Sequence, residues 1–94
     1  MGFKFAQKKA IGHLLDGTYL LEDRERQCVK NKLATGEISA SQVILLLQAC
    51  QGSGYEEREH DFVRTVKVHI FRVKGWYVKL YFIDPNCVFI SVHE

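Results

Sequence analysis

Residues that could carry acid–base chemistry gather in the last third of the chain. They are His69, Tyr77, Lys79 and His93. Cleavage of RNA by attack of its own 2′-hydroxyl needs a base to take that proton, an acid to protonate the leaving oxygen, and cations to stabilise the charge that develops. Histidine can act as acid or base near neutral pH, tyrosine or lysine can donate a proton or a positive charge, and no metal or cofactor is needed. These four side chains are our candidate catalytic residues.

The same part of the chain offers side chains that could hold an RNA strand. We expect four of them to bind RNA: Lys67, Arg72, Tyr81 and Ser91. Lysine and arginine can contact phosphates, and a tyrosine ring can stack on an unpaired base. The net charge is only +2, but residues 62 to 94 are basic whereas residues 37 to 61 are acidic. This asymmetry is compatible with a polyanion-binding face, although charged residues more often only solvate a surface.

Strands must position these residues, because apolar and polar residues alternate after about residue 62. One apolar series comprises Val66, Val68, Ile70, Trp76, Val78, Leu80, Phe82, Val88, Ile90 and Val92. Residues 73 to 75 and 84 to 86 have turn chemistry, and we expect each to form a three-residue hairpin loop. The pattern predicts an antiparallel sheet of three strands or more over about residues 62 to 93.

The register of these strands follows if their apolar sides coincide, since a slip of one residue would expose them to water. Ile70 is then opposite Val78, and Leu80 is opposite Ile90. The other face carries three expected cross-strand rows, namely His69, Lys79 and Ser91, then Phe71, Tyr77 and His93, then Lys67, Tyr81 and Phe89. Two imidazoles, two lysines and two phenols should therefore converge on one patch.

The first half of the chain has helical periodicity. Apolar residues three and four positions apart predict helices over about residues 4 to 15 and 20 to 33. Ser39 and Gln42 form a capping box that begins a third helix. The sequence thus predicts an α+β fold, in which helices within about residues 4 to 51 pack on one face of the C-terminal antiparallel sheet.

The composition is that of an ordinary globular chain. Its 94 residues are 47% hydrophobic and 26% charged, and this length suits a single domain. No apolar run approaches the roughly 18 to 20 residues of a membrane span, and the N-terminus is too charged for a secretory signal. We therefore expect a cytoplasmic protein without a membrane partner. Cys28, Cys50 and Cys87 are odd in number and widely spaced, so we expect reduced thiols rather than disulfides or a zinc pair.

Each candidate also has an ordinary structural interpretation. The solvated face of an antiparallel sheet commonly carries lysine, histidine, serine and tyrosine. A metal site at His69 and His93 is a weak alternative, because no carboxylate or thiolate shares their expected rows. His60 and Asp61 could form an acid–base pair, but they lie in a charged connector where solvated side chains are usual. His13, within the first predicted helix, is most simply structural.

Two segments of the C-terminal third have a familiar pattern: GWYVKLYFI at residues 75 to 83 and CVFISVHE at residues 87 to 94. Together they resemble the closing hairpin of the MqsR family of mRNA-cleaving toxins and, more loosely, the wider RelE-like group. The resemblance implies helices followed by a twisted antiparallel sheet, with Tyr77, Lys79 and His93 on an RNA-cleaving surface. The chain departs from the family at two positions, because Glu56 follows Tyr55 where the family has a lysine, and His93 replaces a terminal lysine.

These features lead us to expect a metal-independent RNA endonuclease of the toxin–antitoxin type that cleaves single-stranded mRNA on the exposed sheet face. Its expected partners are single-stranded RNA, an antitoxin protein and a second copy of the chain. A protein partner could pair with an open sheet edge near residues 62 to 73 or 87 to 92. Two alternatives stay open: a non-catalytic module that binds RNA by charge and stacking, and a protein-interaction module that docks through exposed aromatic residues.

Overall fold

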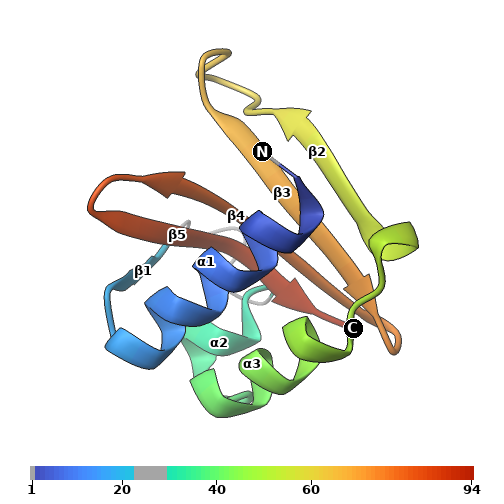
Figure 1. The fold of residues 1–94 in the computed structure, drawn as a ribbon. Helices are drawn as coiled ribbons and strands as arrows, with labels where there is room; N and C mark the ends of the chain where they lie inside the picture. Colours follow the sequence, from blue (N-terminus) through green and yellow to red (C-terminus); the bar gives the residue numbers. More distant parts are fainter. Residues whose placement is uncertain (1, 23–29) are drawn as a thin grey trace.

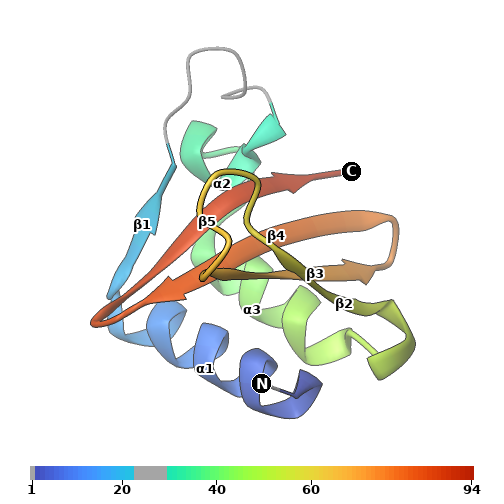
Figure 2. The ribbon, with the colours of Figure 1, turned by 90° about the horizontal axis from the view of Figure 1, so that it is seen from above.

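The computed structural model describes residues 2–22 and 30–94. Over these residues the chain forms an α+β fold, in which helices pack against a five-stranded sheet (Figures 1 and 2). The elements in chain order are α1 (Phe3–Asp16), β1 (Tyr19–Leu21), α2 (Lys32–Thr35), α3 (Ala40–Ala49), the 3-10 turn η2 (Gly52–Gly54), β2 (Tyr55–Glu59), β3 (Lys67–Val73), β4 (Trp76–Ile83) and β5 (Asn86–His93). The α+β class predicted from the sequence is confirmed.

The sheet has the strand order β1-β5-β4-β3-β2. Neighbouring strands are antiparallel except β1 and β5, which are parallel. The sheet is therefore mixed, and the expectation of a purely antiparallel sheet is wrong at β1. Figures 1 and 2 show α1 and α3 on one side of the sheet, and α2 adds Leu33 to the core on that side.

Capping residues mark the end of helix α1 and the start of helix α3. The Ser39 side chain accepts a hydrogen bond from the Gln42 amide, and the Gln42 side chain accepts one from the Ser39 amide, as predicted. Helix α1 is followed by Gly17, whose φ of 72° is the left-handed conformation that glycine adopts readily. Among the helices that the structure describes, none is long and apolar enough to cross a membrane.

The predicted helix over residues 20 to 33 is wrong at its start, and at its end only Lys32 and Leu33 are helical. Tyr19–Leu21 form β1, and α2 begins only after Asn31; residues 23 to 29, with Cys28, lie outside the described residues. The Asn31 side chain is buried, accepts a hydrogen bond from the Ala34 amide, and donates one to the Phe89 carbonyl. This asparagine therefore caps α2 and holds it against β5.

Sequence analysis missed β2, because its run of charged residues is also typical of a connector. The strand lies at the edge of the sheet and pairs with β3 alone. Charged side chains suit an edge strand, since they reach water and discourage pairing with other chains. Gly54 lies immediately before it, and a Cβ at this position would be 2.2 Å from the Arg72 carbonyl oxygen. Only glycine allows this close approach of β2 and β3.

The register between β3 and β4 differs from the prediction by one residue. Val73 pairs with Trp76, so the turn consists of Lys74 and Gly75 alone. Both have positive φ, 50° and 80°, as a two-residue type I′ turn requires. The predicted three-residue loop is therefore wrong. Because alternate residues point to opposite faces, every side chain of β3 lies on the face opposite to the predicted one.

Strands β4 and β5 follow the predicted register at one end only. Val78 pairs with Val92, as predicted, whereas Leu80 pairs with Phe89 instead of Ile90. The turn between the strands has two residues instead of the predicted three. A β-bulge between the two pairs then restores the predicted phase toward the end of the chain.

The central strands are buried on both faces, which is why alternation alone gave the wrong phase. The main core lies on the helix side and includes Phe71, Val78, Leu80, Cys87, Phe89 and Val92. The opposite side, which we call the outer face, carries a second cluster of Val68, Ile70 and Ile90, against which Tyr77 and Tyr81 pack. Phe71 and Phe89 were expected among the exposed residues and are instead fully buried in the main core.

The close approach at Gly54 predicts a specific effect on stability. We expect Gly54→Ala to lower the free energy of unfolding by about 1 to 3 kcal/mol, because the new methyl group meets backbone that cannot rotate away. Gly12→Ala is the matched control: this glycine is in α1 with open space around it, so alanine should stabilise the protein by about 0.5 to 1 kcal/mol. Urea unfolding of both variants measures the difference. A neutral Gly54→Ala would contradict the packing of β2 on β3.

Candidate functional site on the outer face of the sheet

The strand pairing sets three rows of side chains across the outer face. They are Arg72, Tyr77 and His93, then Glu56, Ile70, Lys79 and Ser91, then Arg58, Val68, Tyr81 and Val88. Six of the eight residues proposed from the sequence lie on this face. Compared with the prediction, each member from β3 is replaced by its neighbour in the chain, so Arg72 stands where Phe71 was expected.

Tyr77 and His93 form the centre of this site. They are direct cross-strand partners, and their rings stack with centroids 5.1 Å apart and planes at 25°. His93 Nδ1 lies 3.0 Å from the Glu94 carbonyl oxygen, which can only accept a hydrogen bond. Nδ1 therefore carries the proton of the neutral ring, and Nε2 is left with a lone pair that can accept one. Both side chains are half-buried and reach solvent.

Arg72 adds a positive charge to the same row. Its guanidinium lies over the Tyr77 ring, 5.5 Å from the centroid, and Nη1 is 2.9 Å from Glu56 Oε1. Arg58 also donates hydrogen bonds to the Glu56 carboxylate. The two guanidinium groups hold the pKa of Glu56 below its usual value, with the hydrogen bond from Arg58 as the larger cause. Two cations thus surround one carboxylate, which leaves this end of the outer face positive.

Lys79 and Ser91 form the next pair along the two strands. Lys79 is half-buried between the two tyrosines of β4, and no hydrogen bond or ion pair joins it to any residue in 2–22 or 30–94. Its ammonium group is therefore available to an anion. The Ser91 side chain is largely buried, at 8% exposure, so it offers less to a ligand than the sequence suggested.

A groove continues from Tyr77 to the end of the β3–β4 hairpin. It has a volume of about 390 Å³ and is lined by Arg72, Val73, Lys74, Gly75, Trp76 and Tyr77. Two cations, Arg72 and Lys74, and the Tyr77 ring are features that hold unpaired nucleotides, through phosphate contacts and stacking. Sequence analysis missed the role of Lys74 here, because the turn was expected to be longer. Trp76 packs against the main core on the helix side, as predicted.

Tyr81 is less open than expected. It packs on the outer-face cluster, and its ring meets the His60 ring edge-on, with centroids 5.2 Å apart. His60 comes from the loop between β2 and β3, where its Nδ1 accepts hydrogen bonds from the amides of Phe62 and Val63. Tyr81 therefore joins that loop to the sheet, and His60 has a structural partner in place of the solvated position expected from the sequence.

His69 and Lys67 do not join this site, because they lie on the helix side of β3. His69 is only 2% exposed, and its Nδ1 is 2.7 Å from the Tyr55 hydroxyl. The predicted row of His69, Lys79 and Ser91 is therefore wrong at its first member. The cause is the two-residue turn, which reverses the faces of β3. Because β3 is buried on both faces, the alternation of apolar and polar residues along it could not reveal this reversal.

Burial sets the protonation states of the Tyr55–His69 pair. It raises the pKa of Tyr55 to about 12, with a further contribution from the Glu57 charge. It lowers the pKa of His69, because a charged imidazole loses its hydration there. Near neutral pH the phenol therefore keeps its proton and the imidazole is uncharged.

The described residues contain no group of three or more histidine, cysteine, aspartate or glutamate side chains that could hold a metal ion. Cys50 and Cys87 are free and buried. Burial raises the pKa of both thiols, to about 12 for Cys87, so they stay protonated.

Comparisons with known proteins assign no family to the chain. A scan against models of protein families, a search of curated proteins and a search of solved structures each found no match. The resemblance of the C-terminal hairpin to the MqsR family therefore stays a prediction from the two segments that carry it.

The uncharged state of His69 predicts how stability depends on pH. Its pKa is lower in the folded chain than the value of about 6.5 expected when unfolded, so the unfolded chain binds more protons as the solution is acidified. Its contribution to the free energy of unfolding should be intact above pH ~7 and lost as pH falls through the folded pKa. Urea unfolding at several pH values measures this loss.

A matched pair of variants isolates the contribution of His69. His69→Gln should flatten the loss of stability on acidification, whatever its effect at neutral pH. His13→Gln, at the end of α1, should keep the slope of the unchanged protein. Equal slopes in all three proteins would show that His69 is not held uncharged by the fold.

Proposed function

We propose that the protein is a metal-independent RNA endonuclease of the toxin–antitoxin type, which cleaves single-stranded mRNA on the outer face of its sheet. The observation that carries the proposal is the row of Arg72, Tyr77 and His93 with Lys79 beside it. Base, acid and cations lie there within one cross-strand step of each other, on a surface that solvent reaches. The resemblance of the C-terminal hairpin to the MqsR family supports the same function.

In the proposed mechanism His93 acts as the base. Its Nε2 accepts the proton of a 2′-hydroxyl, and the freed oxygen attacks the adjacent phosphorus. The 5′-oxygen of the next nucleotide leaves and takes a proton from the Tyr77 hydroxyl. The products are a 2′,3′-cyclic phosphate and a 5′-hydroxyl, and solvent returns the proton from His93 to Tyr77.

Positive charge supplies the rest of the catalysis. The Lys79 ammonium, which pairs with none of the described residues, lies beside the reacting row, and the Arg72 guanidinium lies within it, where negative charge develops on the phosphorane oxygens. Glu56 neutralises part of the Arg72 charge and is itself held by Arg58. Lys79 is therefore the main electrostatic group in this mechanism, whereas His69, which the sequence placed beside it, has no part.

The groove beside Tyr77 supports single-stranded RNA as the substrate. Tyr77 offers a ring for an unpaired base, while Arg72 and Lys74 offer contacts for the phosphates beside it. A duplex could not present its bases to this ring without being opened. The strand would then run from the hairpin end toward His93.

The proposed protein partner is an antitoxin or a second copy that adds a strand to the sheet. The strands at the two ends of the described sheet are β1 and β2, whereas β3 and β5 are paired on both sides. The edges expected near residues 62 to 73 and 87 to 92 are therefore wrong. Leu20 and Leu21 on β1 are exposed, but β2 is charged, so β1 is the edge better suited to apolar pairing.

A second candidate function is RNA binding without cleavage. The observation that favours it is the groove itself, because two cations and an aromatic ring can hold a strand by charge and stacking. Binding alone would show a steep dependence on salt and would leave the RNA intact. The two functions share a surface and differ in whether His93 and Tyr77 do chemistry.

The first experiment measures cleavage of a labelled single-stranded RNA by the pure protein, with a chelator present. We expect His93→Ala to slow cleavage about 100- to 10,000-fold, since it removes the base, and Tyr77→Phe to have an effect in the same range. His13→Ala changes a histidine on the other side of the sheet and should cleave at the original rate. Equal rates for His93→Ala and the unchanged protein would refute the mechanism, and they would also reveal a contaminating nuclease.

The second experiment measures RNA binding. Lys74→Asn removes one charge from the groove, and asparagine tolerates the positive φ of this position. We expect weaker binding to every sequence tested, and a slope of log affinity against log salt that is smaller by about 1. Lys8→Asn, on α1, removes the same charge from the helix side and should change neither quantity. An equal effect of both variants would place the RNA elsewhere.

A further inference from the structure

A pocket lies between α1 and the end of α3, on the helix side of the sheet, and the proposed cleavage reaction uses none of its residues. We call it the α1–α3 pocket. Its volume of about 590 Å³ suits a small molecule, since sites for such ligands typically measure about 300 to 1,000 Å³. Lys4 and Lys8 line it together with Gln7, Gln48 and Gln51, and no acidic side chain among the described residues does so. The pocket is therefore positively charged.

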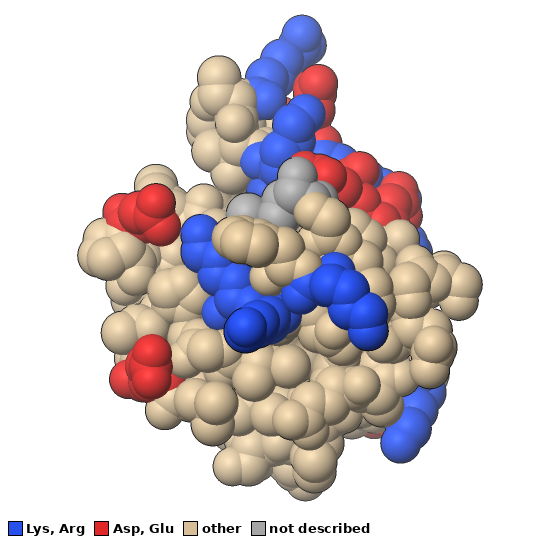
Figure 3. Space-filling model, viewed as in Figure 1, with Lys and Arg blue, Asp and Glu red and all other residues tan. Residues whose placement is uncertain are grey.

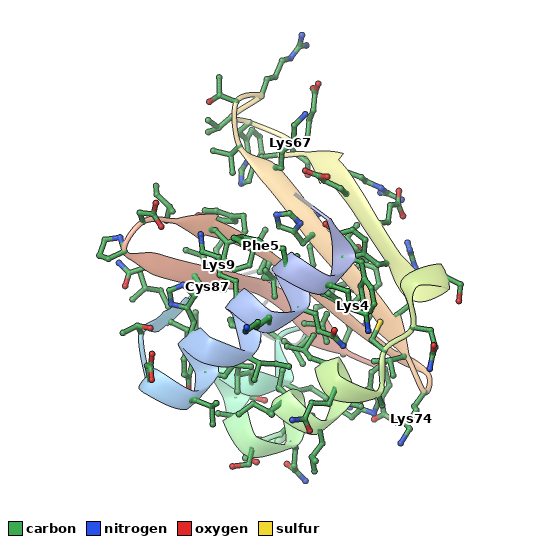
Figure 4. All side chains as sticks on the ribbon, in the orientation of Figure 1. Lys4, Phe5, Lys9, Lys67, Lys74 and Cys87 are labelled. Atoms are coloured by element: carbon green, nitrogen blue, oxygen red, sulfur yellow. The ribbon has the colours of Figure 1, made fainter. Side chains whose placement is uncertain are left out.

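Lysine side chains gather over α1, as Figure 3 shows. Residues 1 to 15 contain Lys4, Lys8 and Lys9 but no aspartate or glutamate. Figure 4 shows Lys4 on the side of α1 toward α3 and Lys9 on the other side. Lys9 Nζ has a partner, because it lies 3.6 Å from Asp84 Oδ1. The charges of Lys4 and Lys8 have no such partner in the part of the chain that the structure describes.

The positions of Lys4 and Lys8 on α1 are electrostatically unfavourable. The two residues are four apart, so their ammonium groups project from the same side of the helix and repel each other. Lys4 also lies in the first turn, where the helix dipole is positive and no acidic residue is present. An anion bound between the two lysines would relieve both effects. The arrangement therefore favours an anionic ligand.

The walls of the α1–α3 pocket are held in place by their own contacts. The Phe3 ring packs against the Tyr55 ring, with centroids 5.6 Å apart, and Lys4 Nζ lies 5.6 Å from the Phe3 centroid. Gln7 Nε2 donates a hydrogen bond to the Leu47 carbonyl at 2.6 Å, which joins α1 to α3. A fixed aromatic wall thus lies next to a cation.

Cys50 lines the same pocket without adding negative charge. Its Sγ lies within hydrogen-bond distance of the carbonyl oxygens of Gln51 and Arg72. Burial raises the pKa of the thiol, so it stays protonated near neutral pH. The side chains of Gln48 and Gln51 are exposed, and their amides can both donate and accept hydrogen bonds. The pocket thus offers two ammonium groups to an anion, and neutral polar groups and a ring to the rest of the ligand.

We propose that the α1–α3 pocket binds a small aromatic phosphate monoester, the chemical class to which mononucleotides belong. The phosphate lies between Lys4 and Lys8, because two ammonium groups match a group that carries a charge of about −1.5 to −2 near pH 7. The aromatic ring packs against Phe3 and Ile11, and the glutamine amides bind polar atoms at its edge.

RNA is the rival occupant, because its backbone is also an anion. Each phosphodiester of RNA carries only about one negative charge, whereas the pocket presents two unpaired cations to a single site. A strand would also need further cations beyond the pocket, and Lys9, the next lysine of α1, is already paired with Asp84. The α1–α3 pocket is separate from the row of Tyr77 and His93 on the outer face, so the proposal does not depend on RNA cleavage.

The experiment is an NMR titration of the full chain with adenosine 5′-monophosphate near neutral pH. We expect the amide signals of Gln51 and Gly52 and the ring signals of Phe3 to shift, and phenyl phosphate to shift the same signals. Adenosine lacks the phosphate and inorganic phosphate lacks the ring, so each should bind at least about tenfold more weakly. Acidification below pH ~6 should weaken the monophosphate, because its phosphate then loses one of its two charges.

Variants separate this pocket from general charge effects. Lys4→Gln should weaken adenosine 5′-monophosphate at least about tenfold, because it removes one of the two cations beside the phosphate. Lys9→Gln is the matched control: it removes the same charge from the same helix without lining the pocket, and it should bind as before. His93→Ala should also bind as before, so a failure of the cleavage mechanism would not affect this result.

Two further variants distinguish the α1–α3 pocket from the RNA groove. Lys8→Asn should weaken adenosine 5′-monophosphate and leave RNA binding unchanged, whereas Lys74→Asn should do the reverse. Unmoved signals at saturation, equal binding of adenosine or inorganic phosphate, or equal affinities of Lys4→Gln and Lys9→Gln would overturn the proposal. Displacement of the monophosphate by a single-stranded RNA without a terminal phosphate would also overturn it, since the pocket would then belong to an RNA surface.

Discussion

The two residues of the β3–β4 turn decide which side chains reach each face of the sheet. Lys74 and Gly75 both have positive φ, so the turn closes in two residues and Val73 pairs with Trp76. A turn one residue longer would leave β4 in place and reverse every side chain of β3. Phe71 and His69 would then leave the core, and Arg72 would lose its contact with Tyr77. Both the main core and the outer-face site therefore depend on the geometry of this turn.

The bulge in β5 is the second constraint, because it changes which alternate residues of the strand face the helices. Before it, Cys87 and Phe89 face the helices; after it, Val92 does so, and His93 reaches the outer face beside Tyr77. A bulge weakens the ladder locally, and here the Asn31 side chain donates to the Phe89 carbonyl next to it. The same asparagine caps α2. The position of His93 thus depends on a residue far from it in the chain, which sequence spacing cannot reveal.

The helix-capping signal and one end of the β4–β5 register predict the structure correctly, whereas the turn lengths and the phase of β3 do not. The capping box of Ser39 and Gln42 needs only four residues to be recognised, and the pairing of Tyr77 with His93 needs only a common phase at one end of a hairpin. In contrast, β3 has apolar residues on both faces, so alternation could not choose its phase. Strand β2 consists mainly of charged residues, which an edge strand can expose to water, so it lacks the apolar alternation that would predict a strand.

The phase of β3 also separates the two histidines by environment, and environment determines what an imidazole can do. His93 is half-exposed and its Nδ1 donates to a backbone carbonyl, so the lone pair of Nε2 is left to accept a hydrogen bond. His69 is buried against Tyr55 and Phe82, and burial lowers its pKa, so it stays uncharged near neutral pH. An uncharged buried imidazole is poorly suited to taking a proton from a substrate, because burial opposes its charged form. In the sequence pattern the two histidines look alike. Their difference in environment arises only because the two-residue turn places them on opposite faces of the sheet.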